Sequence, residues 1–177
     1  MGLDMLVALF DRFNISVTRE NHDNLDLRRF RQGFVYLSTI CGIDSSYRHK
    51  WVREPWSDDL SEDIFRLAVG GAKNRGGTFK KEANESLKEI EKLTTSPPGL
   101  SKERWVELLS TIHYYRNICE VRNRGPDQIK NALRGINSSR KVYFEESPAR
   151  KFYMLEFKKA WGRLKRSGLL NYKPDYW

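Results

Sequence analysis

The sequence predicts a mainly α-helical fold, a helical domain with a C-terminal winged helix-turn-helix-like module. Apolar residues recur every three or four positions in one segment after another, which is the spacing of one face of an α-helix. Glycine and proline lie between these segments, and the clearest helix breaker is Ser96-Pro97-Pro98-Gly99. It separates an N-terminal helical part, residues 1–95, from a C-terminal part, residues 101–177, and we expect the two to form one compact unit.

Helical spacing predicts four helices before the breaker. They are Leu3–Phe13, Leu27–Cys41 ending at Gly42, a helix from the N-cap Ser57 to Gly70-Gly71, and about Lys80–Thr94. On the second helix the apolar residues share one face, while Arg28, Arg29 and Arg31 point elsewhere. Tyr47–Val52 is expected to form a short extended piece.

The C-terminal part has the element order of a winged helix-turn-helix. A long helix follows the cap Ser101 and runs to about Cys119, and a short helix covers Asp127–Ile136. A longer helix is expected from Ser147-Pro148 to about Arg166, because proline favours the first helical position. Gly168 ends it, and Leu169-Leu170 is expected to start a strand. In such modules the third helix lies in the major groove of DNA.

The net charge of +9 is confined to the last third of the chain. Residues 1–120 hold 18 Lys and Arg and 18 Asp and Glu, whereas residues 121–177 hold 14 and 5. A local field of one sign attracts polyanions, and nucleic acid is the commonest such partner. Two other interpretations stay open: a solvated basic face, and a patch that binds an acidic or apolar surface of a protein partner.

The expected third helix carries most of the candidate nucleic-acid-binding residues, and DNA is the favoured ligand. These residues are Arg150, Lys151, Lys158, Lys159, Arg163, Lys165 and Arg166, with Arg140 and Lys141 in the preceding loop. Lys and Arg neutralise phosphates, and Arg also pairs with guanine. The structural alternative is that Lys158, Lys159 and Lys165 form the solvated side of an amphipathic helix.

No catalytic residue, metal ligand or cofactor site is predicted, so the protein is not expected to be an enzyme. The sequence shows no Ser-His-Asp or Cys-His arrangement, and its two cysteines and three histidines lack zinc-ligand spacing. Cys41 and Cys119 lie in apolar helical patterns, which favours small buried thiols over a disulfide. The paired glycines 70–71 and 76–77 lack the setting of a phosphate loop.

The sequence also favours a cytoplasmic location without a membrane partner. No apolar stretch approaches the ~20 residues that span a bilayer. Met1–Phe13 contains Asp4 and Asp11 and lacks a basic region before an apolar run, which disfavours a secretory signal.

Three stretches resemble a family of bacterial and archaeal proteins, the YwgA-like group, which is more distantly akin to the Panacea proteins. They are LRRFRQGFVYLSTICGID at Leu27–Asp44, YRHKWVREPWSDDLSEDI at Tyr47–Ile64, and Trp105–Leu170, which ends in Gly-Leu-Leu. The resemblance implies a helical fold with a winged-helix-like part and supplies no catalytic residues. Panacea proteins are associated with toxin–antitoxin and phage-related loci, so it also implies an antitoxin or defence role.

The second stretch departs from the family pattern. Glu54-Pro55-Trp56-Ser57 stands where the family has Gly-Pro-Tyr-Ser, so a glycine-dependent turn is not expected here. Arg53–Asp63 has two interpretations, a recognition surface or a turn that starts a helix and is pinned by Trp56. The second is favoured, because Ser57 fits an N-cap and the carboxylates that follow it suit the first turn of a helix.

Overall fold

The computed structural model describes residues 2–52, 54–70, 79–118, 125–138 and 154–172, and these residues form a mainly α-helical fold. The helices are α1 Leu3–Arg12, α2 Leu25–Ile40, α3 Asp58–Gly70, α4 Ala83–Thr94, α5 Lys102–Ile118, α6 Pro126–Ser138 and α8 Met154–Arg166. A 3₁₀-helix, η1, covers Leu169–Asn171, and two short strands, β1 Lys50–Trp51 and β2 Pro55–Trp56, pair antiparallel. None of the described helices combines the length and apolar character needed to cross a membrane.

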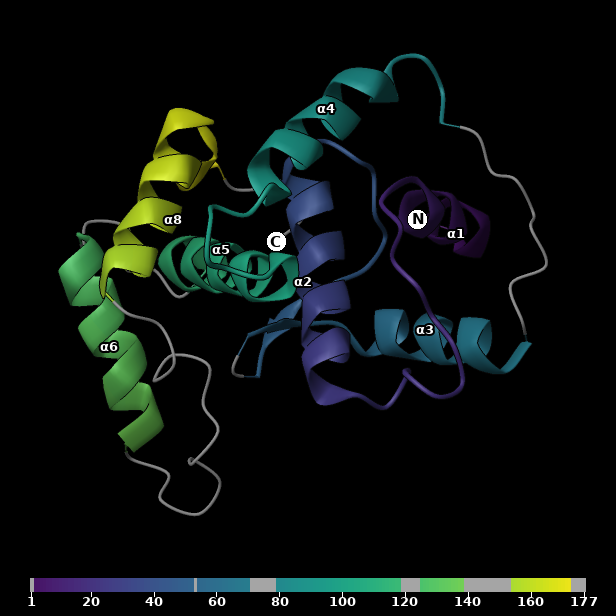
Figure 1. The fold of residues 1–177 in the computed structure, drawn as a ribbon, viewed down its shortest axis with the longest axis horizontal. Helices are drawn as coiled ribbons and strands as arrows, with labels where there is room; N and C mark the ends of the chain where they lie inside the picture. Colours follow the sequence, from purple (N-terminus) through teal and green to yellow (C-terminus); the bar gives the residue numbers. More distant parts are fainter. Residues whose placement is uncertain (1, 53, 71–78, 119–124, 139–153, 173–177) are drawn as a thin grey trace.

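Helix α2 forms the centre of the fold, and every residue from Arg29 to Ile40 is buried. Helix α5 packs against it, α3 and α4 also contact it, and α6 and α8 lie on the α5 side (Figure 1). The α2–α5 contact is the most extensive between any two described elements. A helix surrounded in this way buries nearly its whole circumference, so its sequence is less amphipathic than that of a surface helix.

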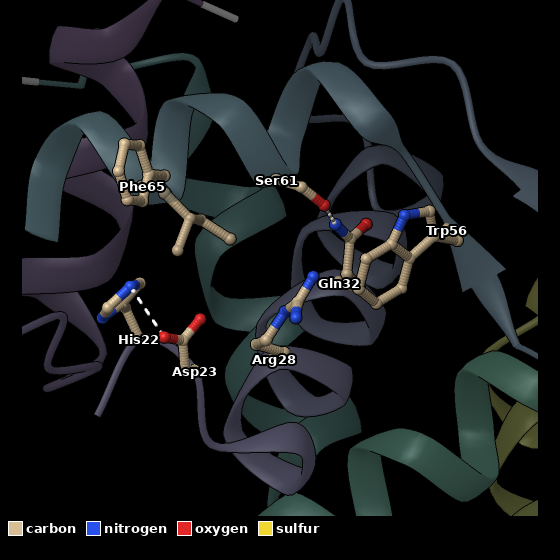
Figure 2. A pocket seen from close by; sticks show the side chains of 8 residues that line it. His22, Asp23, Arg28, Gln32, Trp56, Ser61 and Phe65 are labelled. Atoms are coloured by element: carbon tan, nitrogen blue, oxygen red, sulfur yellow. Dashed lines mark hydrogen bonds and ion pairs between the residues drawn. The ribbon is translucent and has the colours of Figure 1, made fainter. Parts of the chain in front are cut away.

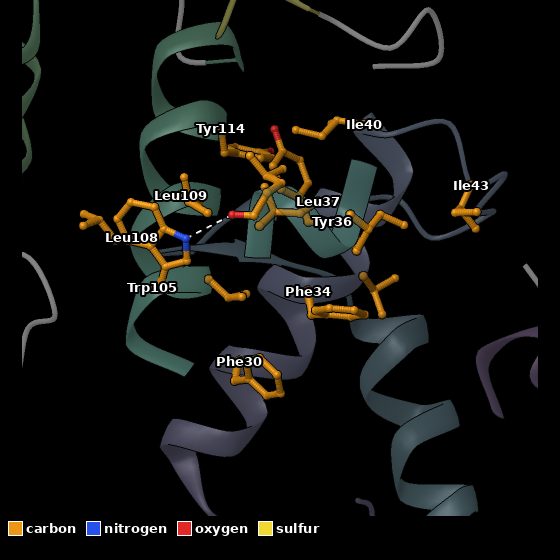
Figure 3. Close-up of a cluster of buried hydrophobic side chains, with 14 of the residues drawn as sticks. Phe30, Phe34, Tyr36, Leu37, Ile40, Ile43, Trp105, Leu108, Leu109 and Tyr114 are labelled. Carbon is orange, nitrogen blue, oxygen red and sulfur yellow. Dashed lines mark hydrogen bonds between the residues drawn. The ribbon is translucent and has the colours of Figure 1, made fainter. Parts of the chain in front are cut away.

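The core joins residues from both sides of the proline-glycine breaker. Phe34 and Leu37 of α2 and Trp105 and Leu109 of α5 are at most 1% exposed and belong to one apolar cluster (Figure 3). The Trp105 indole N–H donates to the Leu93 carbonyl at 3.0 Å, which satisfies the polar atom of a side chain buried for its apolar area. The two parts of the chain therefore share this core.

Two arginines of α2 are buried rather than solvated. The Arg29 guanidinium lies 3.3 Å from the Glu54 carboxylate, and both side chains are largely buried. Arg31 is fully buried and donates to the carbonyl of Ser16 and to Asn21. Both point away from the apolar face, as the spacing predicts, but other segments of the chain cover them there, because α2 lies at the centre.

Most of the predicted helix ends are confirmed. Gly42, with φ +95°, follows α2, and Gly168, with φ +76°, follows α8; glycine tolerates this left-handed conformation. Ser57 and Ser101 accept hydrogen bonds from backbone N–H groups three residues later. The predicted start of the last long helix at residues 147–148 lies outside the described residues.

The strand predicted to start at Leu169-Leu170 is wrong, because these residues form η1. His113 Nε2–H donates to the Leu169 carbonyl at 2.9 Å. Arg116 and Asn117 donate to the Leu170 carbonyl at 2.6 and 3.0 Å. Three side chains of α5 thus take the carbonyl groups that a strand would offer to a neighbouring strand, and Leu170 is buried.

Gly33 sets the closeness of α2 and α5, and we expect Gly33→Ala to lower the free energy of unfolding. A Cβ at this position would lie 2.6 Å from Ser110 Oγ and 3.3 Å from Ser110 Cβ. This clash opposes the gain of about 1 kcal/mol that alanine brings to a helix interior. Urea unfolding of G33A, S110A and the double variant measures this clash. The loss of unfolding free energy caused by G33A is expected to be smaller in the S110A background. Losses that simply add in the double variant would contradict this explanation.

Candidate nucleic-acid interface

Helix α8 is fixed to the protein by one apolar face. Phe157, Ala160 and Leu164 are buried, and the helix contacts both α5 and α6. Their spacing of three and four residues places them on one side of an α-helix. The opposite side of α8 is consequently turned to solvent.

Four of the predicted site residues lie on that solvent side: Lys158, Lys159, Lys165 and Arg166 are exposed. We call this surface the α8 cationic face. The two lysines precede the other two cations by seven residues, about two turns and roughly 10 Å along the helix axis. The α8 cationic face therefore presents two pairs of positive charges in line.

Two acidic residues of the described part of the chain lie at α8 and reduce this charge only partly. Glu156, the one acidic residue of α8, is turned toward α5, where it lies 3.3 Å from Arg104. Asp127, at the start of α6, lies 3.7 Å from the Lys158 ammonium. An exposed pair at this distance is weak, so Lys158 keeps access to a stronger anionic partner.

Arg163 does not lie on the α8 cationic face, although the sequence groups it with the other cations. Its guanidinium packs over the Trp105 ring, 5.8 Å from the centroid, and donates to the Lys92 carbonyl. These contacts join α8 to α4 and α5. Arg163 thus contributes to the placement of α8, and charge alone grouped it with the other cations in the sequence.

Two residues that were not predicted from the sequence lie beside the cations of α8. Gly162 is half-buried between the two pairs of cations, and an added Cβ there would meet only the Arg166 guanidinium, at 3.2 Å. Leu155 is 65% exposed. A glycine in a helix interior costs about 1 kcal/mol relative to alanine. A glycine in the middle of a predicted helix was therefore the sequence signal that could have pointed to this position. Packing does not require the glycine, but the close approach of another molecule's backbone would benefit from it.

The remaining candidates, Arg140, Lys141, Arg150 and Lys151, lie outside the described residues. Among the described elements, α5, α6 and α8 contact one another pairwise, so the three helices of the predicted module do pack together.

No family model, curated protein or solved structure matches this chain. The resemblance to the YwgA-like group stays a prediction from the three sequence stretches. The function is therefore inferred from the geometry and charge of the described residues.

The other candidate functional groups of the described residues are the His, Cys, Asp and Glu side chains. They include no group of three His, Cys, Asp or Glu side chains arranged to hold a metal ion. Burial, with the nearby Glu89 carboxylate, raises the pKa of the Cys41 thiol to about 12, which disfavours the reactive thiolate; Cys119 lies outside the described residues. Burial lowers the pKa of His49 and of His113 to about 4. What α8 presents to solvent is positive charge, which suits a polyanion.

Proposed function

We propose that this protein binds nucleic acid, with DNA favoured, through the α8 cationic face. In this proposal α5, α6 and α8 form a winged-helix-like module without enzymatic activity, and the protein acts as a regulator or as a component of a defence or toxin–antitoxin system. The pathway follows from the YwgA-like resemblance, whereas the binding surface follows from the charge and exposure of α8.

One observation carries the proposal: α8 directs four of its cations outward and its single carboxylate inward. Lys158, Lys159, Lys165 and Arg166 are exposed while Glu156 contacts Arg104. Lysine and arginine at a helix C-terminus also stabilise the helix dipole, which is sufficient to explain Lys165 and Arg166. It does not explain Lys158 and Lys159, which lie in the first half of α8.

The salt dependence of binding tests the proposal. Affinity for fluorescent double-stranded DNA, single-stranded DNA and RNA is measured across a salt series by anisotropy. Each phosphate contacted contributes about −0.9 to the slope of log K against log salt on B-DNA, so four cations predict a slope of about −3.6. The absence of binding at low salt would contradict the proposal, as would an affinity that does not change with salt.

Leu155 favours a second candidate function, a protein-interaction module such as an antitoxin. Its apolar side chain is 65% exposed one helical turn before Lys158 and Lys159, and apolar contacts bordered by charged groups are typical of protein interfaces. This function predicts a co-purifying partner that is lost on Leu155→Ser, together with no salt-dependent affinity for DNA or RNA.

A further inference from the structure

A small pocket lies between α2, α3 and the segments that precede each of them (Figure 2). Helices α3 and α8 lie on opposite sides of α2 (Figure 1). Its volume is about 100 Å³. Its lining includes His22, Asp23, Arg28, Trp56, Ile64 and Phe65. The pocket is separate from the α8 cationic face, so a ligand bound in it would be independent of the proposed function.

Arg28 supplies the charge of this pocket. Its guanidinium stacks over the Trp56 ring, 5.1 Å from the centroid, and within the described part of the chain it forms no hydrogen bond or ion pair. The neighbouring Arg29 and Arg31, by contrast, are buried and bound to Glu54 and Asn21. A planar guanidinium held against an aromatic ring keeps its N–H donors available in a fixed orientation, and that fork matches a carboxylate.

Buried side chains of α2 hold two walls of the pocket in place. Arg31 donates to Asn21 at 2.7 Å and to the Ser16 carbonyl at 2.6 Å, which fixes the segment that carries His22. Gln32 donates to the Ser57 carbonyl and to Ser61 Oγ, and its amide oxygen accepts from the Ser57 N–H, each at 2.9 Å. These bonds fix the start of α3. A pocket with fixed walls costs a ligand less ordering entropy.

The side of the pocket formed by α3 is apolar. Phe65 is 52% exposed, and its ring lies 5.6 Å from the His22 ring, centroid to centroid. Ile64 is the other apolar residue of α3 that lines the pocket, and Figure 2 shows Phe65 on the same side. Asp23, the one carboxylate of the lining, lies 3.2 Å from His22 Nε2, and its side chain is 81% exposed, so solvent screens it.

We propose that this pocket binds a small organic carboxylate with an apolar body. The carboxylate accepts hydrogen bonds from the Arg28 guanidinium above Trp56, and the apolar body packs on Ile64 and Phe65. An amide or alcohol of the same shape lacks the negative charge that pairs with Arg28, so it is expected to bind less tightly. Inorganic phosphate lacks the apolar body that the α3 side accepts.

The indole N–H of Trp56, which donates to Asp58 at 3.2 Å, is the reporter. Its signal in an ¹⁵N spectrum of the full chain is assigned with Trp56→Phe and followed during titration with benzoate, benzamide or inorganic phosphate. Benzoate is expected to shift it saturably, and benzamide and phosphate are not. Since a hydrogen bond to a charged group contributes about 1.5–3 kcal/mol, Arg28→Gln is expected to weaken benzoate binding about 10- to 100-fold.

Arg66→Gln is the matched control, because Arg66 is exposed and paired with Glu62 and Asp63 on α3 outside the pocket; it is expected to leave the titration unchanged. If R28Q fails to fold, Arg28→Lys replaces it. Lysine keeps the charge but lacks the planar guanidinium, so the affinity for benzoate is again expected to fall. Equal shifts with benzoate and benzamide would overturn the proposal. So would phosphate binding as strong as benzoate binding, unchanged affinity in the Arg28 variants, or the absence of a saturable shift.

Discussion

Replacement of both Lys158 and Lys159 with glutamate is expected to abolish nucleic-acid binding while the protein stays folded. Both side chains are exposed and lie away from the buried residues of α8. The double variant changes the charge of the α8 cationic face by four units. Loss of two phosphate contacts lowers the salt slope by about 2, and we expect the affinity at low salt to fall about 100-fold or more. Anisotropy titrations measure both quantities.

Lys80→Glu with Lys81→Glu is the matched control, because this pair is also exposed and makes the same charge change just before α4. It separates a local effect on α8 from the effect of net charge. Lys158 also lies near Asp127, so Lys159→Glu with Lys165→Glu provides a second variant that leaves that pair intact. Retained affinity in both α8 variants, or an equal loss in the α4 control, would refute the proposed surface.

Acid is expected to destabilise the fold strongly, because two histidines are buried in neutral form. The Tyr36 hydroxyl donates to His113 Nδ1 at 2.5 Å, and His113 Nε2–H donates to the Leu169 carbonyl. A proton on Nδ1 would remove the acceptor that Tyr36 uses. His49 packs edge-on against the same tyrosine ring. Burial lowers the pKa of both histidines from 6.5 to about 4.

The sign of the effect follows from proton binding. Between pH 6.5 and about 4 the unfolded chain binds protons that the folded chain does not, so the free energy of unfolding falls as the pH falls through this window. Each histidine contributes a slope of up to about 1.4 kcal/mol per pH unit. Against a typical total stability of about 5–15 kcal/mol, two such histidines matter.

Urea unfolding across this pH window, followed by tryptophan fluorescence, measures the effect. His113→Gln and His49→Gln each remove one of the two titrating groups, so each is expected to flatten the pH dependence even where it lowers stability at neutral pH. A stability that is the same at pH 7 and pH 5 would contradict neutral burial of these rings.

Helix positions followed from local patterns, since apolar spacing and capping residues act over a few positions. Ser57, Ser101, Gly42 and Gly168 mark ends that the structure confirms. The burial of Arg31 had no local signal, because its partners in the preceding loop are defined only once the chain has folded. The strand expected at Leu169 failed for the same reason: α5, far away in the sequence, takes its carbonyl.

The candidate sites divide in the same way. Charge counting found Lys158, Lys159 and Lys165, which the structure leaves exposed. It also selected Arg163, whose contacts with Trp105 and Lys92 depend on how helices pack. The pocket around Arg28 was not predicted, because it is formed by α2, α3 and the segments that precede each of them, which only the fold brings together. Trp56 was expected to pin a turn, and its stacking with Arg28 is a tertiary contact.

The shared core has a consequence for protein engineering. Cutting the chain at the Pro97-Pro98-Gly99 breaker would uncover Trp105, Val106 and Leu109, which are buried here. The basic C-terminal part is therefore not expected to fold on its own when fused to another protein, even though its charge is confined to one end of the sequence. Substitutions selected for their effect on the contacts of α8 must therefore be compatible with a core that includes α2.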